Sequence, residues 1–340
     1  QKISNIGDEA RRVERFMSGV LELKNRDFEW VHLSGAWLKE RHIKATTVSQ
    51  GTMSVGSLKG ASGHQHNPFV ALKEKSTSND HGYVYGANLI YSGNFLAQVE
   101  MDEWNNLRLM IGMHPEHFSW KLDPGETFES PESIFTFSNL GMNGLIQESA
   151  QFVEKHIIPP HWQERERPIV FNNWEATYFD FDEEKLLSLA KESRSLGMEC
   201  FVLDDGWFGN RNSDRSSLGD WTANIAKFPK GIGHFAQEIH ALDLKLGIWF
   251  EPEMVSPDSK MYQEHPEWVV KHPYNRISIG RGQYVLDFAN PIVVESIFQA
   301  MKEIILETNL DYIKWDMNRN ITEAYSAYLA ENGIAQTEFY

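Results

Sequence analysis

The chain has 340 residues, which is enough for two domains or for one large barrel with an additional domain. Its 41% hydrophobic and 12% aromatic content is typical of a folded globular protein. The 32 Lys and Arg residues against 48 Asp and Glu residues give a net charge of −16, which argues against nucleic acid or an anionic membrane as a partner. A neutral substrate is compatible with this charge.

The single cysteine, Cys200, excludes an intrachain disulfide and a thiolate metal cluster. It lies in the apolar run 198–208, which favours a small buried core residue over a nucleophile. No apolar run approaches the roughly 18–20 residues of a membrane span. No signal peptide is evident either, although the chain does not begin with Met. We therefore expect a cytoplasmic protein without a membrane segment and without a cofactor.

The first 140 residues read as short strands separated by turns. Turn signals include Ser-Gly at 92–93 and Asp-Pro-Gly at 123–125. This spacing is typical of an antiparallel β-sandwich, so residues 1–140 are expected to form part of an N-terminal sandwich domain. The expected strand segments are 28–48, 69–74, 83–93, 95–102, 107–113 and 134–139.

A helix is expected over 142–158, followed by the proline-rich and charged stretch 159–168. We therefore interpret residues 141–168 as a helical linker to a second domain. From residue 169 the pattern changes to strand–helix alternation. Strands are expected over 169–176, 199–205, 244–253 and 310–316, and helices over 182–197, 231–243 and 291–309.

Repeated βα units predict a parallel sheet, either doubly wound or closed into a (β/α)8 TIM barrel. We favour the barrel, because every expected strand ends in polar or aromatic residues, as catalytic groups at the carboxyl ends of barrel strands do. No G-x-G-x-x-G follows a strand, as a doubly wound nucleotide site would require. Only four or five of eight units are present, so residues 169–340 are expected to be the first half of an incomplete barrel.

The stretch DYIKWDMNR, residues 311–319, is a hydrophobic strand, expected to be buried, that ends in a cluster of ionisable groups. Lys314, Asp316 and Asn318 are spaced by two and point to one face of an extended chain. Asp316 could be a nucleophile, a metal ligand or a helix cap. Lys314 on the same face would favour an ionised carboxylate, as a covalent glycosidase nucleophile requires.

Two further carboxylate pairs follow expected strands. Asp204 and Asp205, in VLDDGWF, diverge at a strand end, so they could accept hydrogen bonds from two hydroxyls of one sugar ring. Turn formation before Gly206 would explain one of them but not both. Glu251 and Glu253, in FEPEM, could be a general acid and base, and structural hydrogen bonding explains them equally well.

Two other motifs have competing interpretations. The H-x-H pair at His64 and His66 resembles a metal motif, but it lies in a loop composition without further ligands. We therefore predict no metal site and favour hydrogen bonding within the loop. Arg281 is flanked by glycines, which would let it reach a ligand, although a surface arginine in a mobile loop would look the same.

Together these segments resemble the bacterial α-galactosidases of glycoside hydrolase family 36. The resemblance covers nearly the whole chain, in the segments LSGAWLKERH, GASGHQHNPF, VYGANLIYSGNF, NNWEATYFDF, LDDGWFG, LGIWFEPEM and YIKWDMNR. The family has a β-sandwich domain, a (β/α)8 barrel and a small C-terminal β-domain. The resemblance implies retaining hydrolysis of terminal α-galactosides such as melibiose and raffinose.

The resemblance also implies a role for individual residues. Asp316 would be the nucleophile, and the contacts to galactose would come from a set around it. Asp204 and Asp205 would hold the sugar hydroxyls at positions 4 and 6, Lys314 and Asn318 would contact the galactose, Trp249 and Trp174 would form the pocket walls, and Arg281 would contact the substrate.

The family's general acid/base is an Asp on a later barrel strand, which the resemblance places beyond residue 340. We therefore expect the 340-residue chain alone to hydrolyse no galactoside measurably. Alternatives are a related α-N-acetylgalactosaminidase or galactosyl-transferring enzyme, and a non-catalytic galactose-binding module. A metal-dependent hydrolase would need histidines at the strand ends, where there are none. The resemblance further implies a homo-oligomer, with a tetramer as one form.

Overall fold

The computed structural model describes residues 1–24, 27–322 and 324–332. Within them the chain forms two compact units, one of residues 1–165 and one that begins at Glu166. Residues 333–340, the end of the predicted half-barrel, lie outside the described residues. Among the described helices, none is both long enough and apolar enough to cross a membrane.

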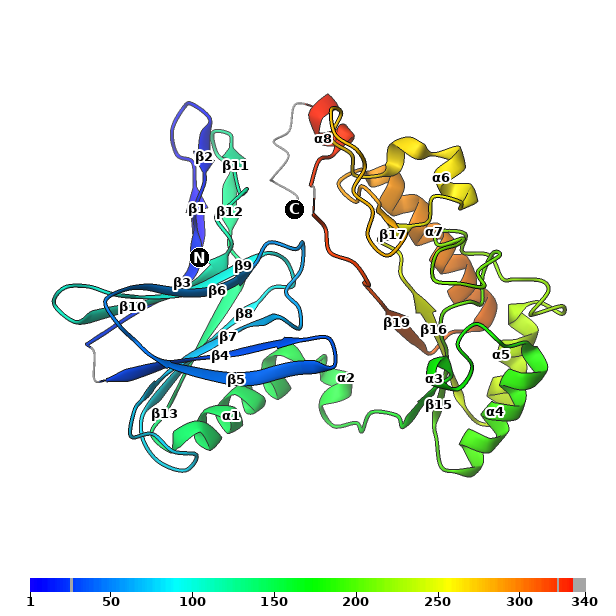
Figure 1. Cartoon of the computed structure of the whole chain (residues 1–340), viewed down its shortest axis with the longest axis horizontal. Coiled ribbons are helices and arrows are strands. Elements are labelled where there is room, and N and C mark those ends of the chain that lie inside the picture. The colour runs from blue at the N-terminus through cyan, green and yellow to red at the C-terminus, as the bar shows by residue number, and fades with distance from the viewer. Residues whose placement is uncertain (25–26, 323, 333–340) are drawn as a thin grey trace. The chain divides into compact units, whose positions relative to one another are not determined.

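The first unit is built on two antiparallel sheets (Figure 1). Residues such as Trp30 from one sheet and Phe95 from the other are buried in one shared core, as in a β-sandwich. The first sheet has the order β3 (Met17–Lys24), β10 (Asn106–Met113), β9 (Phe95–Met101) and β6 (Gly51–Ser57). The second has the order β13 (Glu132–Ser138), β8 (Val84–Ile90), β7 (His66–Glu74), β4 (Phe28–Ala36) and β5 (Lys39–Thr47).

The strand pattern of the sequence is reproduced in the sandwich. Along β9, buried and partly buried residues alternate, which is the pattern of a strand with one face in the core. The segment 28–48 is not one strand but the hairpin β4–β5, because the chain turns at Leu38 with a φ of 59°. Strands β3 and β6 lie outside the expected segments. So do two short strand pairs, namely β1 (Lys2–Ser4) with β12 (Thr127–Glu129) and β2 (Arg11–Val13) with β11 (Trp120–Leu122).

The helix expected over 142–158 is α1 (Gly141–Phe152), which continues as a π-helical turn over Val153–Ile157. The short helix α2 (Pro160–Gln163) follows it. Leu145 of α1 is 1% exposed and packs in a cluster with Val31, Ala71 and Val84 of the second sheet. Helix α1 therefore covers the outer face of the sandwich.

The second unit contains a parallel sheet in the order β14 (Val170–Asn172), β15 (Cys200–Leu203), β16 (Lys245–Phe250) and β19 (Tyr312–Trp315). The main helices are α4 (Glu183–Ser195), α5 (Ile232–Ala241) and α7 (Pro291–Thr308), and α5 packs against both α4 and α7 (Figure 1). In the described residues this sheet stays open at β14 and β19. The predicted architecture, a sandwich followed by an incomplete barrel, is confirmed.

Local sequence signals set the helix ends. Asp182 caps α4 by accepting a hydrogen bond from the backbone N–H of Lys185. Asn290 caps α7 in the same way, with Pro291 in the first turn, and Asn309 ends it in the left-handed conformation. The smaller elements are α3 (Trp174–Thr177), β17 (Met254–Val255), α6 (Lys260–Glu264), a 3-10 turn at Pro266–Trp268, β18 (Tyr284–Val285) and α8 (Ala327–Glu331).

Two expectations about strands in this unit were wrong in detail. The strand expected over 169–176 stops at Asn172, and Trp174 already belongs to α3. The last strand is not buried: Tyr312 is 41% and Ile313 39% exposed, because β19 is an edge of the open sheet. Cys200, in contrast, is fully buried as predicted, and burial raises the pKa of its thiol to about 11.

Candidate active site

Parallel pairing brings the carboxyl ends of the four strands to one edge of the sheet. Asn172 is level with Val202, Leu203 with Ile248, and Phe250 with Trp315. The residues that follow these strands therefore meet at the same edge. They are Asn173 and Trp174 after β14, Asp204 and Asp205 after β15, Glu251 after β16, and Asp316 after β19.

Asp316 is held by three neutral hydrogen-bond donors. Its Oδ2 accepts hydrogen bonds from Trp249 Nε1 at 3.0 Å and from Asn318 Nδ2 at 2.6 Å. Its Oδ1 accepts one from the backbone N–H of Met317 at 3.0 Å. Asp316 is only half-buried, so an oxygen held in this way remains open to a reactant. Donors of this kind fix the direction of the carboxylate oxygens.

The Lys314 ammonium pairs with Asp204 rather than with Asp316. Its Nζ lies 2.7 Å from Asp204 Oδ2, and its side chain remains 38% exposed. Asp204 also accepts from Asn172 Nδ2 at 2.5 Å, and its backbone N–H donates to Asn173 Oδ1. The interpretation of Lys314 as the direct ionic partner of Asp316 is therefore replaced by an ion pair between strands β15 and β19.

Asp205 forms a buried ion pair that the sequence did not reveal. Arg211, 1% exposed, donates from Nε to Oδ1 at 2.6 Å and from Nη2 to Oδ2 at 2.8 Å. Burial raises the pKa of Asp205 above its usual value, and the guanidinium opposes that shift. Both carboxylate oxygens already have a charged donor, so Asp204 and Asp205 differ in how available they are to a ligand.

The loop behind these aspartates is fixed by a second buried cation. Lys227 Nζ donates to the carbonyls of Gly206 at 2.9 Å and Phe179 at 3.0 Å, and it lies 4.0 Å from the ring centre of Phe181. Burial lowers the pKa of this lysine to about 8. Gly206 has a φ of 101°, and a Cβ there would meet the Phe179 ring at 2.9 Å, so only glycine fits this turn.

Asn318 and Arg281 lie in contact with each other beside Asp316. Arg281 Nη1 donates to Asn318 Oδ1 at 2.9 Å, and Arg281 Nη2 lies 3.9 Å from Asp214. Arg281 is half exposed and has a φ of 53°. In this arrangement the amide of Asn318 spans the distance between the arginine and Asp316, so a ligand that enters would exchange with one of these bonds.

The two tryptophans predicted as pocket walls have different environments. Trp249 is 2% exposed, so it acts on Asp316 through its indole N–H more than through an open ring face. Trp174 is partly exposed, and its ring packs edge-on against Tyr178 and Phe179. Of the two, Trp174 is therefore better placed to offer a ring face to a ligand.

Glu251 and Glu253 do not form an acid–base pair. Glu251 is fully buried and accepts hydrogen bonds from the backbone N–H of Asn318 at 2.5 Å and from Gln283 Nε2 at 3.0 Å. Glu253 accepts from the indole of Trp315, which points away from the face that carries Asp316. Burial raises the pKa of Glu251, and the neighbouring Asp316 charge adds to this rise.

The histidine motif lies in the first unit and is bound to a serine. His66 and His32 both hydrogen-bond Ser34 Oγ, at 3.1 Å and 2.7 Å. Burial lowers the pKa of both rings, as does their mutual repulsion in the case of His32. Within the described part of the chain, no cluster of three or more His, Cys, Asp or Glu side chains could hold a metal ion.

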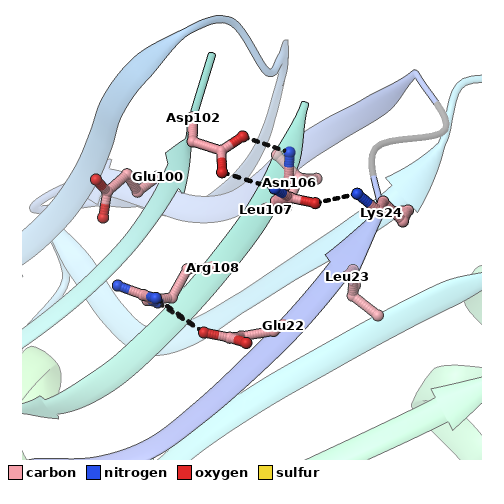
Figure 2. A pocket seen from close by; sticks show the side chains of 8 residues that line it. All are labelled: Glu22, Leu23, Lys24, Glu100, Asp102, Asn106, Leu107 and Arg108. Atoms are coloured by element: carbon pink, nitrogen blue, oxygen red, sulfur yellow. Dashed lines mark hydrogen bonds and ion pairs between the residues drawn. The ribbon is translucent and has the colours of Figure 1, made fainter. Parts of the chain in front are cut away.

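A polar hollow of about 490 Å³ lies on the first sheet of the sandwich. Figure 2 shows that several of its polar side chains are engaged with one another: Arg108 with Glu22, and Asn106 with both Asp102 and Lys24. Glu100 also lines the hollow, with no interaction drawn to it. Exposed pairs of this kind contribute little and do not by themselves indicate a ligand site. The sheet edge that carries Asp316 is therefore the candidate active site.

Two family models match the chain, one after the other. The model described as melibiase matches residues 127–339, and the model described as the glycosyl hydrolase family 36 N-terminal domain matches residues 1–123. The chain belongs to glycoside hydrolase family 36. The family predicted from the sequence motifs is thus confirmed.

Individual relatives agree with this assignment. The chain is 42% identical to the α-galactosidase AgaA of Geobacillus stearothermophilus over 328 residues, which is 96% of this chain and 45% of that protein. It is 43% identical to α-galactosidase 1 of Pediococcus pentosaceus over the same shares. The solved structure of the Lactobacillus brevis α-galactosidase has a TM-score of 0.96 at 45% identity, over 99% of this chain and 45% of that one.

The chain thus spans about 45% of the length of the curated relatives it matches. A doubly substituted variant of AgaA has been solved in complex with raffinose, and that structure has a TM-score of 0.95 at 42% identity, over 99% of this chain and 47% of that one. A further structure of AgaA contains stachyose.

Proposed function

We propose that this chain carries the nucleophile of a retaining α-galactosidase that acts on terminal α-galactosides of the melibiose and raffinose type, with Asp316 as the nucleophile. The observation that carries the proposal is the set of neutral donors on Asp316, from Trp249, Asn318 and Met317, at the carboxyl edge of a parallel sheet. A carboxylate that is ionised, directed and only half-buried is what covalent glycosidic catalysis needs.

The first chemical step joins Asp316 to the sugar. A carboxylate oxygen attacks the anomeric carbon, the bond from this carbon to the leaving oxygen breaks, and an acid protonates that oxygen as the aglycone departs. In the second step, water loses a proton to the same acid/base and attacks the anomeric carbon, which releases galactose and regenerates the carboxylate. Two inversions at one carbon give net retention.

The neighbouring groups support binding of a hydroxyl-rich ring. The exposed part of Lys314 and the Oδ2 of Asp204 present a donor and an acceptor side by side, 2.7 Å apart. Asn318 and Arg281 can exchange their mutual bond for bonds to a sugar. The partly exposed ring of Trp174 offers an apolar surface for a sugar face, and Asp205, tied to Arg211, supports the loop that carries Asp204.

We assign no acid/base among the described residues. Glu251 is fully buried, Glu253 is bonded to Trp315 away from this face, and Asp204 and Asp205 are held in ion pairs. The retaining mechanism needs a second carboxyl about 5–5.5 Å from the nucleophile. We therefore expect the 340-residue chain by itself to show no measurable turnover.

Relatives support the substrate class. Variants of AgaA have been solved with raffinose, at 42% identity to this chain, and with stachyose, at 41%. A homo-oligomer, with a tetramer as one form, is part of the proposal. The exposed apolar side chains of Trp37, Leu38 and Ile43 on the β4–β5 hairpin are a surface that a second copy would cover. Light scattering coupled to size exclusion measures that state.

The test uses protein expressed from its complete coding sequence. It should release nitrophenol from an aryl α-galactoside and galactose from raffinose, and Asp316→Asn should abolish both activities. Turnover that survives in this variant would refute the assignment of Asp316. Galactose binding without turnover would favour the sugar-binding alternative, and a preference for the N-acetylgalactosaminide, or galactosyl transfer in place of hydrolysis, would favour the related enzymes.

A further inference from the structure

Among the carboxylates at the carboxyl ends of the described parallel strands, Glu251 is the one with no exposed surface. It follows β16 directly, and its side chain is fully buried. A buried carboxyl is costly unless its oxygens are hydrogen-bonded. Both oxygens are: Oε1 accepts from the backbone N–H of Asn318 at 2.5 Å, and Oε2 from Gln283 Nε2 at 3.0 Å.

These two bonds reach two different segments of the proposed site. Asn318 donates its side-chain amide to Asp316 at 2.6 Å, so the bond to its backbone fixes the residue that holds the nucleophile. Gln283 closes a tight turn with Gly280, and this turn carries Arg281. Arg281 in turn donates to Asn318. One buried side chain thus connects the strand end, the arginine loop and the residues after Asp316.

We propose that Glu251 is a positioning residue, which holds Asn318 and the Arg281 loop in register with Asp316 without touching the substrate. This inference rests on the proposed function, because it assigns a role in the reaction of Asp316. A fully buried side chain cannot meet the sugar, so its contribution passes through Asn318 and Gln283.

Two electrostatic effects favour the protonated form of Glu251. Burial and the Asp316 charge both raise its pKa, while the bonds from Asn318 and Gln283 oppose the rise. The cations nearby are engaged elsewhere: Arg281 with Asn318 and Asp214, and Arg319 with carbonyls that include that of Gln283. Two carboxyls in one site disfavour a double charge, and Glu251 is the one whose pKa burial raises.

The amide of Gln283 is consistent with a proton on Glu251. Gln283 is 1% exposed, and within the described structure its Oε1 is buried without a hydrogen-bond partner. Because the two ends of an amide are assigned from their bonds, a protonated Glu251 can donate to Oε1 with the amide turned over, which moves the position without a partner from Oε1 to Nε2. A glutamine at position 251 can make the same bond, so Glu251→Gln imitates the neutral acid.

The experiment compares Glu251→Gln, Glu251→Ala and the control Glu253→Gln in protein from the complete coding sequence. Glu253 belongs to the same FEPEM segment but bonds Trp315 on the other face. We expect Glu251→Ala to lower kcat on an aryl α-galactoside about 10- to 100-fold with a smaller change in KM, because two buried donors lose their acceptor. Glu251→Gln should stay within about threefold of wild type, as should Glu253→Gln.

A second readout is the rate at which a galactosyl fluoride inactivator, which needs no acid for its leaving group, labels the enzyme. On the acid side of its pH profile this labelling rate falls, and we call the pH of half-maximal rate the acid limb. The acid limb of Glu251→Gln should lie within about 0.3 pH unit of that of wild type, because residue 251 is neutral in both proteins. A Glu251→Ala protein that folds and keeps wild-type kcat overturns the inference. A Glu251→Gln protein whose kcat falls as far as that of Glu251→Ala also overturns it, as does one whose acid limb moves down by about one pH unit.

The failure of this inference differs from the failure of the proposed function. A wild-type protein that turns over no α-galactoside removes the proposed function. A wild-type protein that is active, with a folded Glu251→Ala variant equally active, removes only the role of Glu251. If Glu251→Ala does not fold, the rate and acid limb of Glu251→Gln decide the question alone.

Discussion

The indole N–H of Trp249 donates to Oδ2 of Asp316 over 3.0 Å, between two neighbouring parallel strands. Trp249 is level with Lys314 in the sheet, two residues before Asp316, so the long indole reaches forward along the strand direction. Hydrogen bonds to charged groups are stronger than those between neutral groups. A buried, rigid ring thus directs the proposed nucleophile.

Replacing Trp249 by Phe should lower kcat about tenfold to a hundredfold while the protein stays folded. The phenyl ring keeps an aromatic side chain but loses the N–H donor and part of the buried indole, and a hydrogen bond to a charged group contributes about 1.5–3 kcal/mol. The matched control is Trp315→Phe, which removes an indole bond to Glu253 on the opposite face. Steady-state kinetics of both variants on an aryl α-galactoside measure the difference. Equal losses in the two variants would contradict a specific role for Trp249.

Arg211→Met should destabilise the fold. It leaves the Asp205 carboxylate buried without its bidentate partner, and breaking a buried pair on one side costs about 3–5 kcal/mol. The control is Arg215→Met in the same loop, whose side chain is 81% exposed and which should change stability by less than about 0.5 kcal/mol. Urea unfolding followed by tryptophan fluorescence gives both values. A shift below about 1 kcal/mol for Arg211→Met would mean that Asp205 is not dependent on this arginine.

Lys314→Met should weaken activity by about 10- to 100-fold in kcat/KM, because Asp204 keeps a buried charge but loses the ammonium 2.7 Å away. Part of the side chain is exposed, so solvent limits the loss. Lys245→Met, at an exposed position that starts β16, is the control and should be silent. A kcat/KM for Lys314→Met equal to that of Lys245→Met would count against the ion pair as a part of the site.

The stability of Glu251→Gln should depend less on pH than that of wild type. The folded-state pKa of Glu251 is raised above its ordinary value of 4.5, so folding favours the protonated form. As pH rises above about 4.5, the unfolded chain releases this proton first, and the wild-type protein loses stability relative to the variant. In thermal unfolding between about pH 4 and pH 7, the Tm of Glu251→Gln should increase relative to that of wild type as the pH rises. A constant difference across this range would show that Glu251 titrates normally.

The sequence was sufficient where a pattern is local. The spacing of Lys314, Asp316 and Asn318 placed them together, because alternation in a strand is fixed by the backbone. It was insufficient where partners are distant: Lys314 pairs with Asp204, 110 residues away. Only the sheet register, which brings β15, β16 and β19 side by side, sets that contact.

Buried charges in loops were also missed. Arg211 lies in the segment GNRNSDRSS, whose Ser, Asn and Asp content is typical of a solvated loop, yet it is 1% exposed. Lys227 and Gln283 are also buried in loops and were not predicted from the sequence. The one available signal for Arg211 was indirect: two consecutive aspartates at the end of a buried strand need a cation nearby.

Mass spectrometry of the protein from its complete coding sequence, after treatment with a mechanism-based galactosyl inactivator, tests the central claim most directly. We expect one galactosyl group per chain, esterified to Asp316 in the peptide that contains residues 311–319, and no label when Asp316 is replaced by Asn. A label on another carboxylate, or full inactivation of the enzyme with Asp316 unmodified, would contradict it.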